Sequence, residues 1–189
     1  MGILDYTMYN QIKSLYEKLG PPMLTNFRIK DLDGNIPFKA GAFTLADQDG
    51  RIVLIKRTLD PKHPEFERYW WIPGGGLESG EGIDDAAIRE FKEETGLEIR
   101  LTKLLVAGLH KNKWFYFFFR GHVSGGELSP YNDPDNTTAD ARYFLPSELS
   151  VEDLWGDVSK IILVKEGFLE YPIDELVIKC GLKNYKDST

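Results

Sequence analysis

The sequence predicts a mixed α/β domain in which helices pack against the faces of one β-sheet. Three observations predict this class. Residues 37–58 read as a β-hairpin, residues 83–95 as an amphipathic helix, and residues 97–109 and 114–123 as two more apolar strands. Because the strands and helices alternate along the chain, we expect a mixed sheet covered by helices on its faces.

The hairpin pattern consists of two apolar segments that flank Asp49-Gly50, a strong turn signal. Residues 59–68 carry two prolines and many charges, which predicts a loop, and residues 69–73 predict a short strand that Pro73 ends. Three glycines follow at 74–76. They predict either a turn with unusual backbone angles or a close approach of the backbone to another group.

The helix at residues 83–95 is the clearest element. Asp84 and Asp85 occupy its first turn, where the helix dipole favours negative charge, and Gly96 is placed as its left-handed C-terminal cap. We expect a stripe made of Ala87, Ile88 and Phe91 to face the core.

The second half of the chain predicts more strands and a second helical region. The run "WFYFFF" at residues 114–119 is too short to cross a bilayer and reads as a strand buried on both faces. Residues 124–140 predict a long polar loop, residues 141–145 a further strand, and residues 146–171 C-terminal helices.

The ends of the chain lie outside this pattern. Residues 5–19 predict an amphipathic helix that Gly20-Pro21-Pro22 stops. We therefore divide the chain into an N-terminal helical appendage (1–35), one domain (36–171) and a C-terminal tail (172–189). The appendage either caps the domain or packs against a second copy, and the second arrangement would make the protein a homodimer.

Composition narrows the classes of function. The formal net charge of −7 argues against a partner that is a nucleic-acid polymer or a membrane surface, although bound cations can still attract small anionic substrates. Cys180 is the single cysteine, and the first ten residues lack the basic start and apolar run of a signal peptide. A reducing, cytoplasmic location is the simplest expectation.

The helix at 83–95 carries a cluster of acidic side chains. Glu90, Glu93 and Glu94 stand three and four positions apart and share one helix face, and Arg89 can pair with Glu93. One arginine cannot neutralise three carboxylates. The face is therefore either a solvated acidic surface or a site for a hard divalent cation such as Mg²⁺ or Mn²⁺, which prefers carboxylate oxygens.

The spacing across residues 75–97 favours the cation site. Gly75, Glu81, Arg89, Glu90, Phe91, Glu93, Glu94, Gly96 and Leu97 stand at the constrained positions of the motif G-x5-E-x7-R-E-U-x-E-E-x-G-U, in which U is bulky and apolar. The sequence thus resembles the Nudix (MutT-like) hydrolase superfamily from about residue 38 to 154. The resemblance implies an α/β/α sandwich with a mixed sheet, the motif forming a loop–helix–loop.

The resemblance also implies an activity, namely Mg²⁺- or Mn²⁺-dependent hydrolysis of the pyrophosphate bond in a nucleoside diphosphate linked to another moiety. Glu90, Glu93 and Glu94 would ligate metal together with the backbone carbonyl of Gly75. Arg89 would orient Glu93 or Glu94, and Glu81 would hold the loop against the helix. The general base would be Glu90 or an acid of the 124–140 loop, and such an acid could instead be a further metal ligand. That loop offers Glu127, Asp133, Asp135 and Asp140.

The substrate itself is less defined by the sequence. Trp71, Arg57 and Tyr116 are the substrate-binding candidates, with Trp70 and Trp114 as further aromatic residues that either stack on a base or pack in the core. Two alternatives to the diphosphate-linked substrate remain open: pyrophosphohydrolysis of nucleoside triphosphates, and nucleotide binding without turnover.

Overall fold

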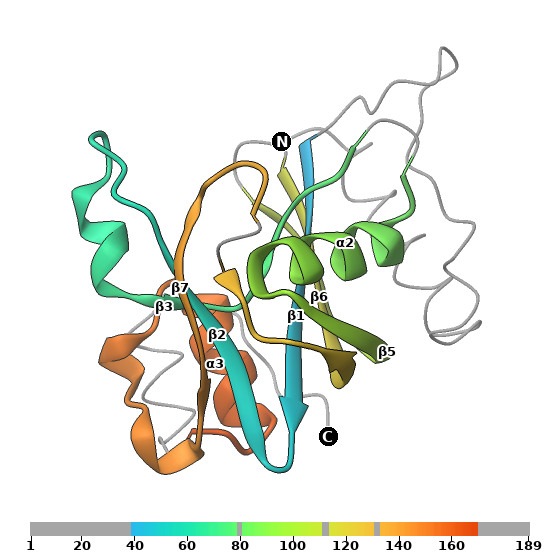
Figure 1. Cartoon of the computed structure of the whole chain (residues 1–189), viewed down its shortest axis with the longest axis vertical. Helices are drawn as coiled ribbons and strands as arrows, with labels where there is room; N and C mark the ends of the chain where they lie inside the picture. The colour runs from blue at the N-terminus through green and yellow to red at the C-terminus, as the bar shows by residue number, and fades with distance from the viewer. Residues whose placement is uncertain (1–38, 79–80, 111–113, 131–132, 170–189) are drawn as a thin grey trace.

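The computed structural model describes residues 39–78, 81–110, 114–130 and 133–169. The predicted leader helix at 5–19 and the tail at 172–189 lie outside the described residues, as does the start of the domain at residues 36–38. The described part forms one seven-stranded sheet with a helix on each face, shown in Figure 1.

The sheet is mixed and is centred on β1 (Lys39–Gln48). Strand β1 runs parallel to β6 (Trp114–Gly126), which in turn pairs antiparallel with β5 (Leu97–His110). On its other side, β1 turns through Asp49 and Gly50, both with positive φ, into β2 (Arg51–Arg57). Strand β2 pairs antiparallel with β7 (Thr138–Phe144) along its length. The Asp-Gly turn and both hairpin strands are confirmed.

Strands β1 and β2 separate after only two residue pairs, and the chain segment at 70–76 fills the gap between them. Its first part, β3 (Trp70–Trp71), pairs with β2, and its second part, β4 (Gly74–Gly76), pairs with β1. This insertion brings three glycines into the centre of the sheet, directly below a helix.

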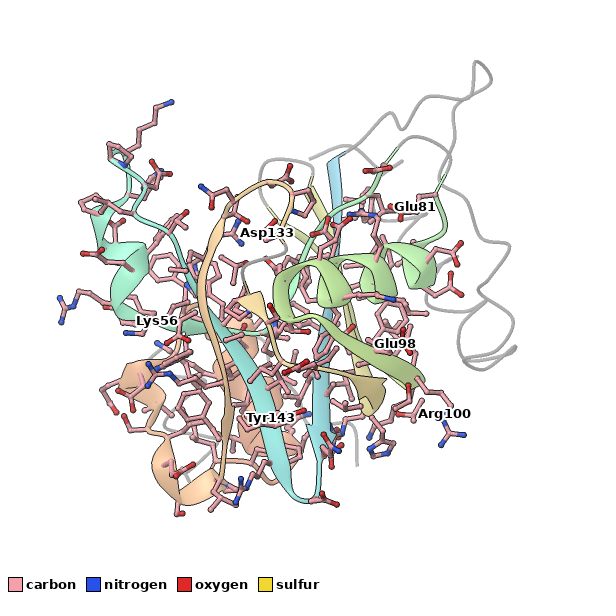
Figure 2. All side chains as sticks on the ribbon, in the orientation of Figure 1. Lys56, Glu81, Glu98, Arg100, Asp133 and Tyr143 are labelled. Atoms are coloured by element: carbon pink, nitrogen blue, oxygen red, sulfur yellow. The ribbon has the colours of Figure 1, made fainter. Side chains whose placement is uncertain are left out.

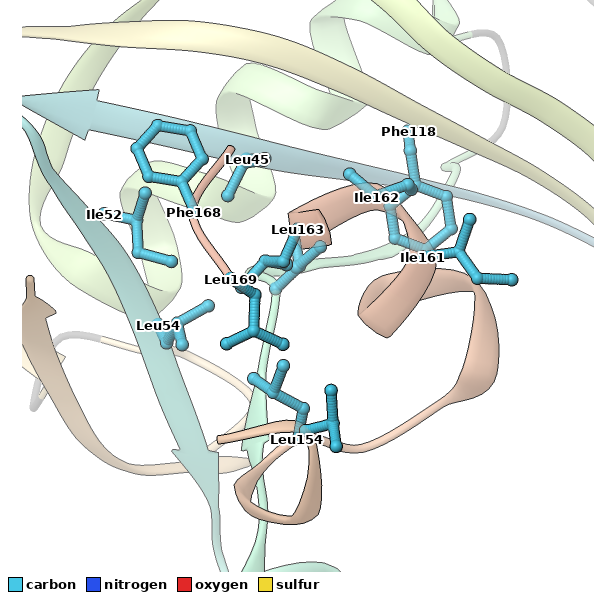
Figure 3. Close-up of a cluster of buried hydrophobic side chains, with 12 residues drawn as sticks. Leu45, Ile52, Leu54, Phe118, Leu154, Ile161, Ile162, Leu163, Phe168 and Leu169 are labelled. Atoms are coloured by element: carbon cyan, nitrogen blue, oxygen red, sulfur yellow. The ribbon is translucent and has the colours of Figure 1, made fainter. Parts of the chain in front are cut away.

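That helix is α2 (Ile83–Thr95), and it lies on one face of the sheet while α3 (Asp157–Lys165) covers the other (Figure 1). Two apolar clusters pack under α2, built on Ala87 and Phe91. The cluster under α3 is the largest, and Figure 3 shows its leucine, isoleucine and phenylalanine side chains between the helix and the strands. The mixed α/β/α sandwich predicted from the sequence is confirmed.

Strand β6 contributes buried side chains to both faces of the sheet. Phe115, Phe117 and Phe119 pack on the α2 side, whereas Phe118 packs on the α3 side, and all four are buried. The prediction that this aromatic run is a strand buried on both faces is confirmed for these four residues. The alternation follows from the two-residue period of a strand.

The bounds of α2 and its end at Gly96, whose φ is 75°, match the prediction. The prediction for Ile88 is wrong: its side chain is 39% exposed, and Ala86 takes the buried position instead. Each residue turns a helix by about 100°, so Ala86 and Ile88 lie on opposite flanks of Ala87, and the flank of Ala86 is the one that packs into the core.

The remaining segments are more ordered than their composition suggests. A 3₁₀ helix, η2 (Pro64–Arg68), forms within the predicted loop at 59–68. The predicted loop at 124–140 is shorter than expected, because β6 continues to Gly126 and β7 starts at Thr138. Residues 146–171 contain two 3₁₀ turns, η4 (Pro146–Glu148) and η5 (Val151–Asp153), before α3.

Candidate active site

The candidate site lies where the glycines of β4 meet the carboxylate face of α2. The backbone of Gly74 has a φ of 148°, and a Cβ there would collide with the backbone of Ala42 and Phe43 in β1. A Cβ on Gly75 would collide with the carboxylate of Glu90. The close backbone approach predicted for this glycine segment is therefore confirmed. It allows Glu90 and Glu94 of α2 to contact the backbone of β4.

Glu94 is the most sheltered of these carboxylates. Its side chain is 3% exposed, and its Oε2 accepts a 2.7 Å hydrogen bond from the N–H of Gly74. The nearest cation is Arg57, whose Nη1 lies 3.7 Å from Oε1. Burial raises the pKa of Glu94 to about 8, because the charge of Arg57 and the Gly74 hydrogen bond offset only part of the desolvation penalty.

Arg89 contacts the remaining carboxylates of the motif. Its guanidinium makes a two-point contact with Glu81, at 2.7 and 2.9 Å, and its Nη1 donates to Glu90 at 3.0 Å and to Glu93 at 2.9 Å. Nη2 also donates to the carbonyl of Gly76 at 2.9 Å. A planar guanidinium suits this geometry because its five N–H donors point in fixed directions.

These contacts bear on the roles predicted for the motif. The expected Arg89–Glu93 pair is present, and Arg89 also holds Glu90, whereas Glu94 accepts its hydrogen bond from Gly74. Glu81 also accepts from the backbone N–H of Glu78, so it joins the loop to the helix through Arg89. Burial pushes the pKa of Glu81 upward, but the hydrogen bonds from Arg89 and Glu78 and the charge of Arg89 together outweigh it, and the pKa lies below its usual value.

Glu90 is sheltered as well as hydrogen-bonded. Burial raises its pKa above the ordinary value, Arg89 opposes that shift, and the nearby charges of Glu93 and Asp135 add to it. The site therefore holds two carboxylates, Glu90 and Glu94, whose negative charge the surrounding protein does not fully compensate.

The donor set fits a hard divalent cation. All candidate ligands are oxygens, from Glu90, Glu93, Glu94 and the carbonyl of Gly75, and oxygen is what Mg²⁺ and Mn²⁺ prefer. Incompletely compensated carboxylates in a sheltered position are what such a cation would neutralise. Among the described residues no three acidic, histidine or cysteine side chains converge as a ready-made metal cage. Glu94 turns to Gly74, whereas Glu90 and Glu93 turn to Arg89.

The acids of the 124–140 segment differ in their surroundings. Asp133 organises its own loop, accepting backbone hydrogen bonds from Asp135, Thr137 and Thr138 and a side-chain one from Thr137. Burial pushes its pKa upward, but these bonds outweigh it and the pKa lies below its usual value. In Figure 2, Asp133 lies toward the same end of the molecule as Glu81, and its charge contributes to the raised pKa of Glu94.

The other three acids are arranged differently. Asp135 is exposed, and its charge contributes to the raised pKa of Glu90. Glu127 is exposed beside the C-terminal end of α2. Asp140 pairs with Arg142 at 2.7 Å and lies opposite Lys56 in the β2–β7 ladder. Lys56 and Arg142 both reach the ring of Trp70, which packs against the core under α3, so Asp140 does not join the carboxylates of α2.

The aromatic candidates also separate. Trp71 lies beside Arg57, whose guanidinium is 5.6 Å from the centre of its ring, so these two predicted residues adjoin Glu94. Tyr116 packs with Phe118 against the core under α3, on the sheet face opposite α2. The structure therefore does not bring Tyr116 to the carboxylates. The side chain of Trp114 lies outside the described residues.

Two features of the site were missed from the sequence. The first is the hydrogen bond from the Gly74 N–H to Glu94. It forms because β4 pairs beside β1, and no local sequence pattern predicts that pairing. Trp155 stacks on Trp71 from a segment more than eighty residues later. Its only signal in the sequence is that it is a tryptophan in a short polar stretch.

Glycines at the centre of a mixed sheet, joined by an arginine to an acidic helix on one face of that sheet, define a Nudix-type site. The chain belongs to the Nudix family: the sequence model of the NUDIX domain matches residues 37–163. The 8-oxo-dGDP phosphatase NUDT18 of Mus musculus is 34% identical over 124 residues, 64% of this chain and 37% of that protein. The ADP-ribose pyrophosphatase of Methanocaldococcus jannaschii is 41% identical over 61 residues, 32% of this chain and 34% of that protein. The matches span about a third of the length of these two relatives.

Solved structures share the fold. A NUDIX hydrolase from Nitrosomonas europaea superposes with a TM-score of 0.58 at 21% identity, covering 67% of this chain and 68% of that one. A MutT NUDIX hydrolase from Burkholderia pseudomallei superposes with a TM-score of 0.53 at 28% identity, covering 67% of this chain and 95% of that one. In the described part of the chain, no helix has the length and hydrophobicity of a membrane span.

Proposed function

We propose that this chain hydrolyses the pyrophosphate bond of a nucleoside diphosphate linked to another moiety, with Mg²⁺ or Mn²⁺ as cofactor. The observation that carries the proposal is Glu94, a carboxylate 3% exposed beside a glycine backbone, with Glu90 sheltered next to it. A protein gains nothing in stability from two sheltered acids with incomplete compensation. Their arrangement is reasonable if a cation and a phosphate complete it.

In this proposal the residues of the motif divide the work. Glu90, Glu93, Glu94 and the carbonyl of Gly75 hold the cation. Arg89 keeps Glu90 and Glu93 in place, and Glu81 keeps Arg89 in place through its two-point contact. A bound divalent cation supplies charge neutralisation at the phosphates and lowers the pKa of the attacking water.

The bond changes follow from that arrangement. The water oxygen forms a bond to one phosphorus, the bridging P–O bond breaks, and the second phosphate leaves with the bridging oxygen. A carboxylate accepts the proton of the water. Glu90 and Asp135 are the two candidates, because Glu90 lies at Gly75 and the charge of Asp135 reaches Glu90, whereas Asp133 already accepts four hydrogen bonds.

The names of the relatives support a phosphoanhydride as the target. The similar proteins include an 8-oxo-dGDP phosphatase, an ADP-ribose pyrophosphatase and an RNA pyrophosphohydrolase of Bartonella quintana. These substrates differ in the attached group and share a P–O–P bond. We propose hydrolysis of the shared P–O–P bond for this chain, and we propose no particular attached group.

The test is a pyrophosphatase assay with Mg²⁺ and with Mn²⁺ on a panel of nucleoside diphosphate derivatives, dinucleotides and nucleoside triphosphates. Glu94→Gln removes the buried charge at nearly constant size. Glu98→Gln is the matched control, because Glu98 is exposed and pairs with Lys92 on the surface. We expect metal-dependent turnover that Glu94→Gln abolishes and Glu98→Gln preserves. Equal activity in both variants would remove Glu94 from the site, and activity on triphosphates alone would favour the alternative of nucleoside triphosphate pyrophosphohydrolysis.

The proposal includes an assembly and a location. We propose a homodimer formed through the helical appendage at 1–35, and a cytoplasmic setting that suits a chain with one cysteine. Sedimentation of the full chain and of a chain that starts near residue 35 tests the dimer. If the shortened chain sediments in the same oligomeric state as the full chain, the appendage does not form the dimer.

A further inference from the structure

Arg57 is the last residue of β2, and its side chain reaches a carboxylate of α2. Successive residues of a strand point to opposite faces of the sheet. Lys56 accordingly contacts Trp70, whose ring packs against the core under α3, whereas Arg57 lies beside Glu94 on the α2 side. Two neighbouring cations therefore have different surroundings, and Lys56, which Figure 2 labels, is a natural control for Arg57.

The contact between Arg57 and Glu94 is an ion pair without a hydrogen bond. Nη1 lies 3.7 Å from Oε1, whereas N–H···O hydrogen bonds span about 2.7–3.2 Å. Arg89, by comparison, contacts three carboxylates of the motif at 2.7 to 3.0 Å. The side chain of Arg57 is also 29% exposed. Arg57 is therefore attracted by the charge of Glu94, and it can move away without breaking a hydrogen bond to that carboxylate.

Arg57 has a second favourable contact, with the ring of Trp71. Its guanidinium lies 5.6 Å from the ring centre, within the range of about 6 Å for a cation–π interaction. The ring of Trp71 is itself positioned by contacts with Phe66 and Trp155. Trp71 thus offers the guanidinium a fixed surface whether or not Arg57 also pairs with Glu94.

A metal ion at Glu94 needs the oxygen that Arg57 faces. Oε2 accepts the hydrogen bond from Gly74, so Oε1 is the freer oxygen, and Arg57 lies beside it. Burial raises the pKa of Glu94, and the charge of Arg57 is the strongest influence in the opposite direction. Two cations near one sheltered oxygen repel each other, because little water screens their charges.

We propose that Arg57 competes with the divalent cation for Glu94 and so sets the affinity of the site for metal. In the metal-free chain Arg57 is the counter-ion of Glu94, and a cation binds to Oε1 as Arg57 withdraws toward Trp71. The inference rests on the metal site of the proposed function and adds a regulatory residue to it. The affinity for metal is then lower than the carboxylates alone would give.

The experiment measures Mg²⁺ binding without substrate, by calorimetry on the full chain. Titrations at pH 9 keep the displacement of a proton from Glu94 small, because its pKa is about 8. Arg57→Gln removes the competing charge, and Arg57→Lys keeps it. Lys56→Gln is the matched control, because it removes one charge from the adjacent residue, which contacts Trp70.

We expect Arg57→Gln to bind Mg²⁺ about 5- to 150-fold more tightly than the unmodified chain, the usual range for coupling between two ligands of one protein. Arg57→Lys and Lys56→Gln should stay within about twofold of the unmodified chain. Mg²⁺ should also change the tryptophan fluorescence of the unmodified chain with the same dissociation constant, and Trp71→Phe should remove most of that change. This signal provides the measurement if Arg57→Gln does not fold.

Three results would overturn the inference. They are an equal or weaker affinity for Mg²⁺ in a folded Arg57→Gln chain, an equal gain in Lys56→Gln, and a fluorescence that does not respond to bound Mg²⁺. The proposed function fails differently, through the absence of metal-dependent turnover of any panel substrate. A chain that gains Mg²⁺ affinity in Arg57→Gln but hydrolyses nothing keeps this inference and loses the activity. A chain that hydrolyses a substrate and shows no such gain keeps the activity and loses the competition.

Discussion

Glu94 in α2 accepts a 2.7 Å hydrogen bond from the backbone N–H of Gly74, twenty residues earlier in the chain. The contact joins the last turn of the helix to the first residue of β4. It gives the carboxylate one donor in a place almost closed to solvent, with Arg57 as its nearest cation. One hydrogen bond and one ion pair at 3.7 Å do not replace full hydration, so the pKa of Glu94 is raised to about 8.

The first prediction is that metal-free protein becomes less stable as the pH rises. Glu94 has a usual pKa of 4.5 and a folded pKa of about 8, so the folded chain binds its proton more tightly than the unfolded chain. The stabilising contribution is complete below about pH 4.5 and is lost as the pH rises through about 8. Urea unfolding in EDTA at pH 5, 6.5 and 8 should show this fall in the free energy of unfolding.

Glu94→Gln isolates the contribution of this residue, because the pKa values of Glu90 and Asp84 are also raised, in both cases mainly by burial. The variant should lose part of the pH dependence and keep the rest. Mn²⁺ should stabilise the unmodified chain most at pH 8, where the carboxylate is otherwise costly. Parallel pH curves for the two proteins would show that Glu94 is not the titrating group.

A second prediction concerns Arg89→Lys. The ammonium of lysine has no planar fork, so it cannot contact Glu81 at two points while also reaching Glu90, Glu93 and the Gly76 carbonyl. Because these contacts orient candidate metal ligands, we expect a loss of about 10- to 100-fold in metal affinity or kcat/KM. Lys92→Gln, on the same helix but paired with exposed Glu98, should change neither. Retention of both values in Arg89→Lys would leave Arg89 with a purely structural role.

Local patterns predicted the local features well. The Asp49-Gly50 turn and the helix that ends at Gly96 depend on neighbouring residues alone, and both are confirmed. The face of α2 was predicted only in part. Glu93 and Glu94 differ by one position, yet the first pairs with Arg89 while the second points at Gly74. Spacing placed both on one face, but it contained no information on what each would meet.

Contacts between distant segments could not be predicted from the sequence. The insertion of residues 70–76 between β1 and β2 places Gly74 under Glu94, and it depends on the pairing of both strands. The same holds for Tyr116: an aromatic strand buried on both faces does not reveal which face carries the site. Its neighbours Phe115 and Phe117 face α2, so the two-residue period sends Tyr116 to the other side.

A third prediction compares two glycines of the same triplet. A Cβ on Gly74 would meet the backbone of β1 at a φ of 148°, so Gly74→Ala should lower the free energy of unfolding by about 2–4 kcal/mol. A Cβ on Gly76 meets nothing within 4 Å, so Gly76→Ala should change stability by about 0.5 kcal/mol or less. Urea denaturation of both variants measures the difference. Similar values for the two would mean that β4 does not pack against β1 as described.

The last prediction separates the two acids of the loop before β7. Asp133 holds this loop through hydrogen bonds from three residues, so Asp133→Ala should cost about 1–3 kcal/mol of stability. Because its folded pKa is depressed, that contribution is present above the unfolded pKa and is lost as the pH falls through the folded one. The difference in stability between the two proteins should therefore shrink in acid.

Asp135→Asn should behave in the opposite way. Its side chain is exposed, so stability should change by about 0.5 kcal/mol or less, while its charge acts on Glu90. If Asp135 accepts the proton of the attacking water, kcat should fall about 100-fold or more with a normal unfolding curve. If kcat is unchanged, Glu90 is the remaining candidate base, and Glu90→Gln should then show the loss. A destabilised Asp135→Asn chain would instead show that this residue, like Asp133, holds the loop.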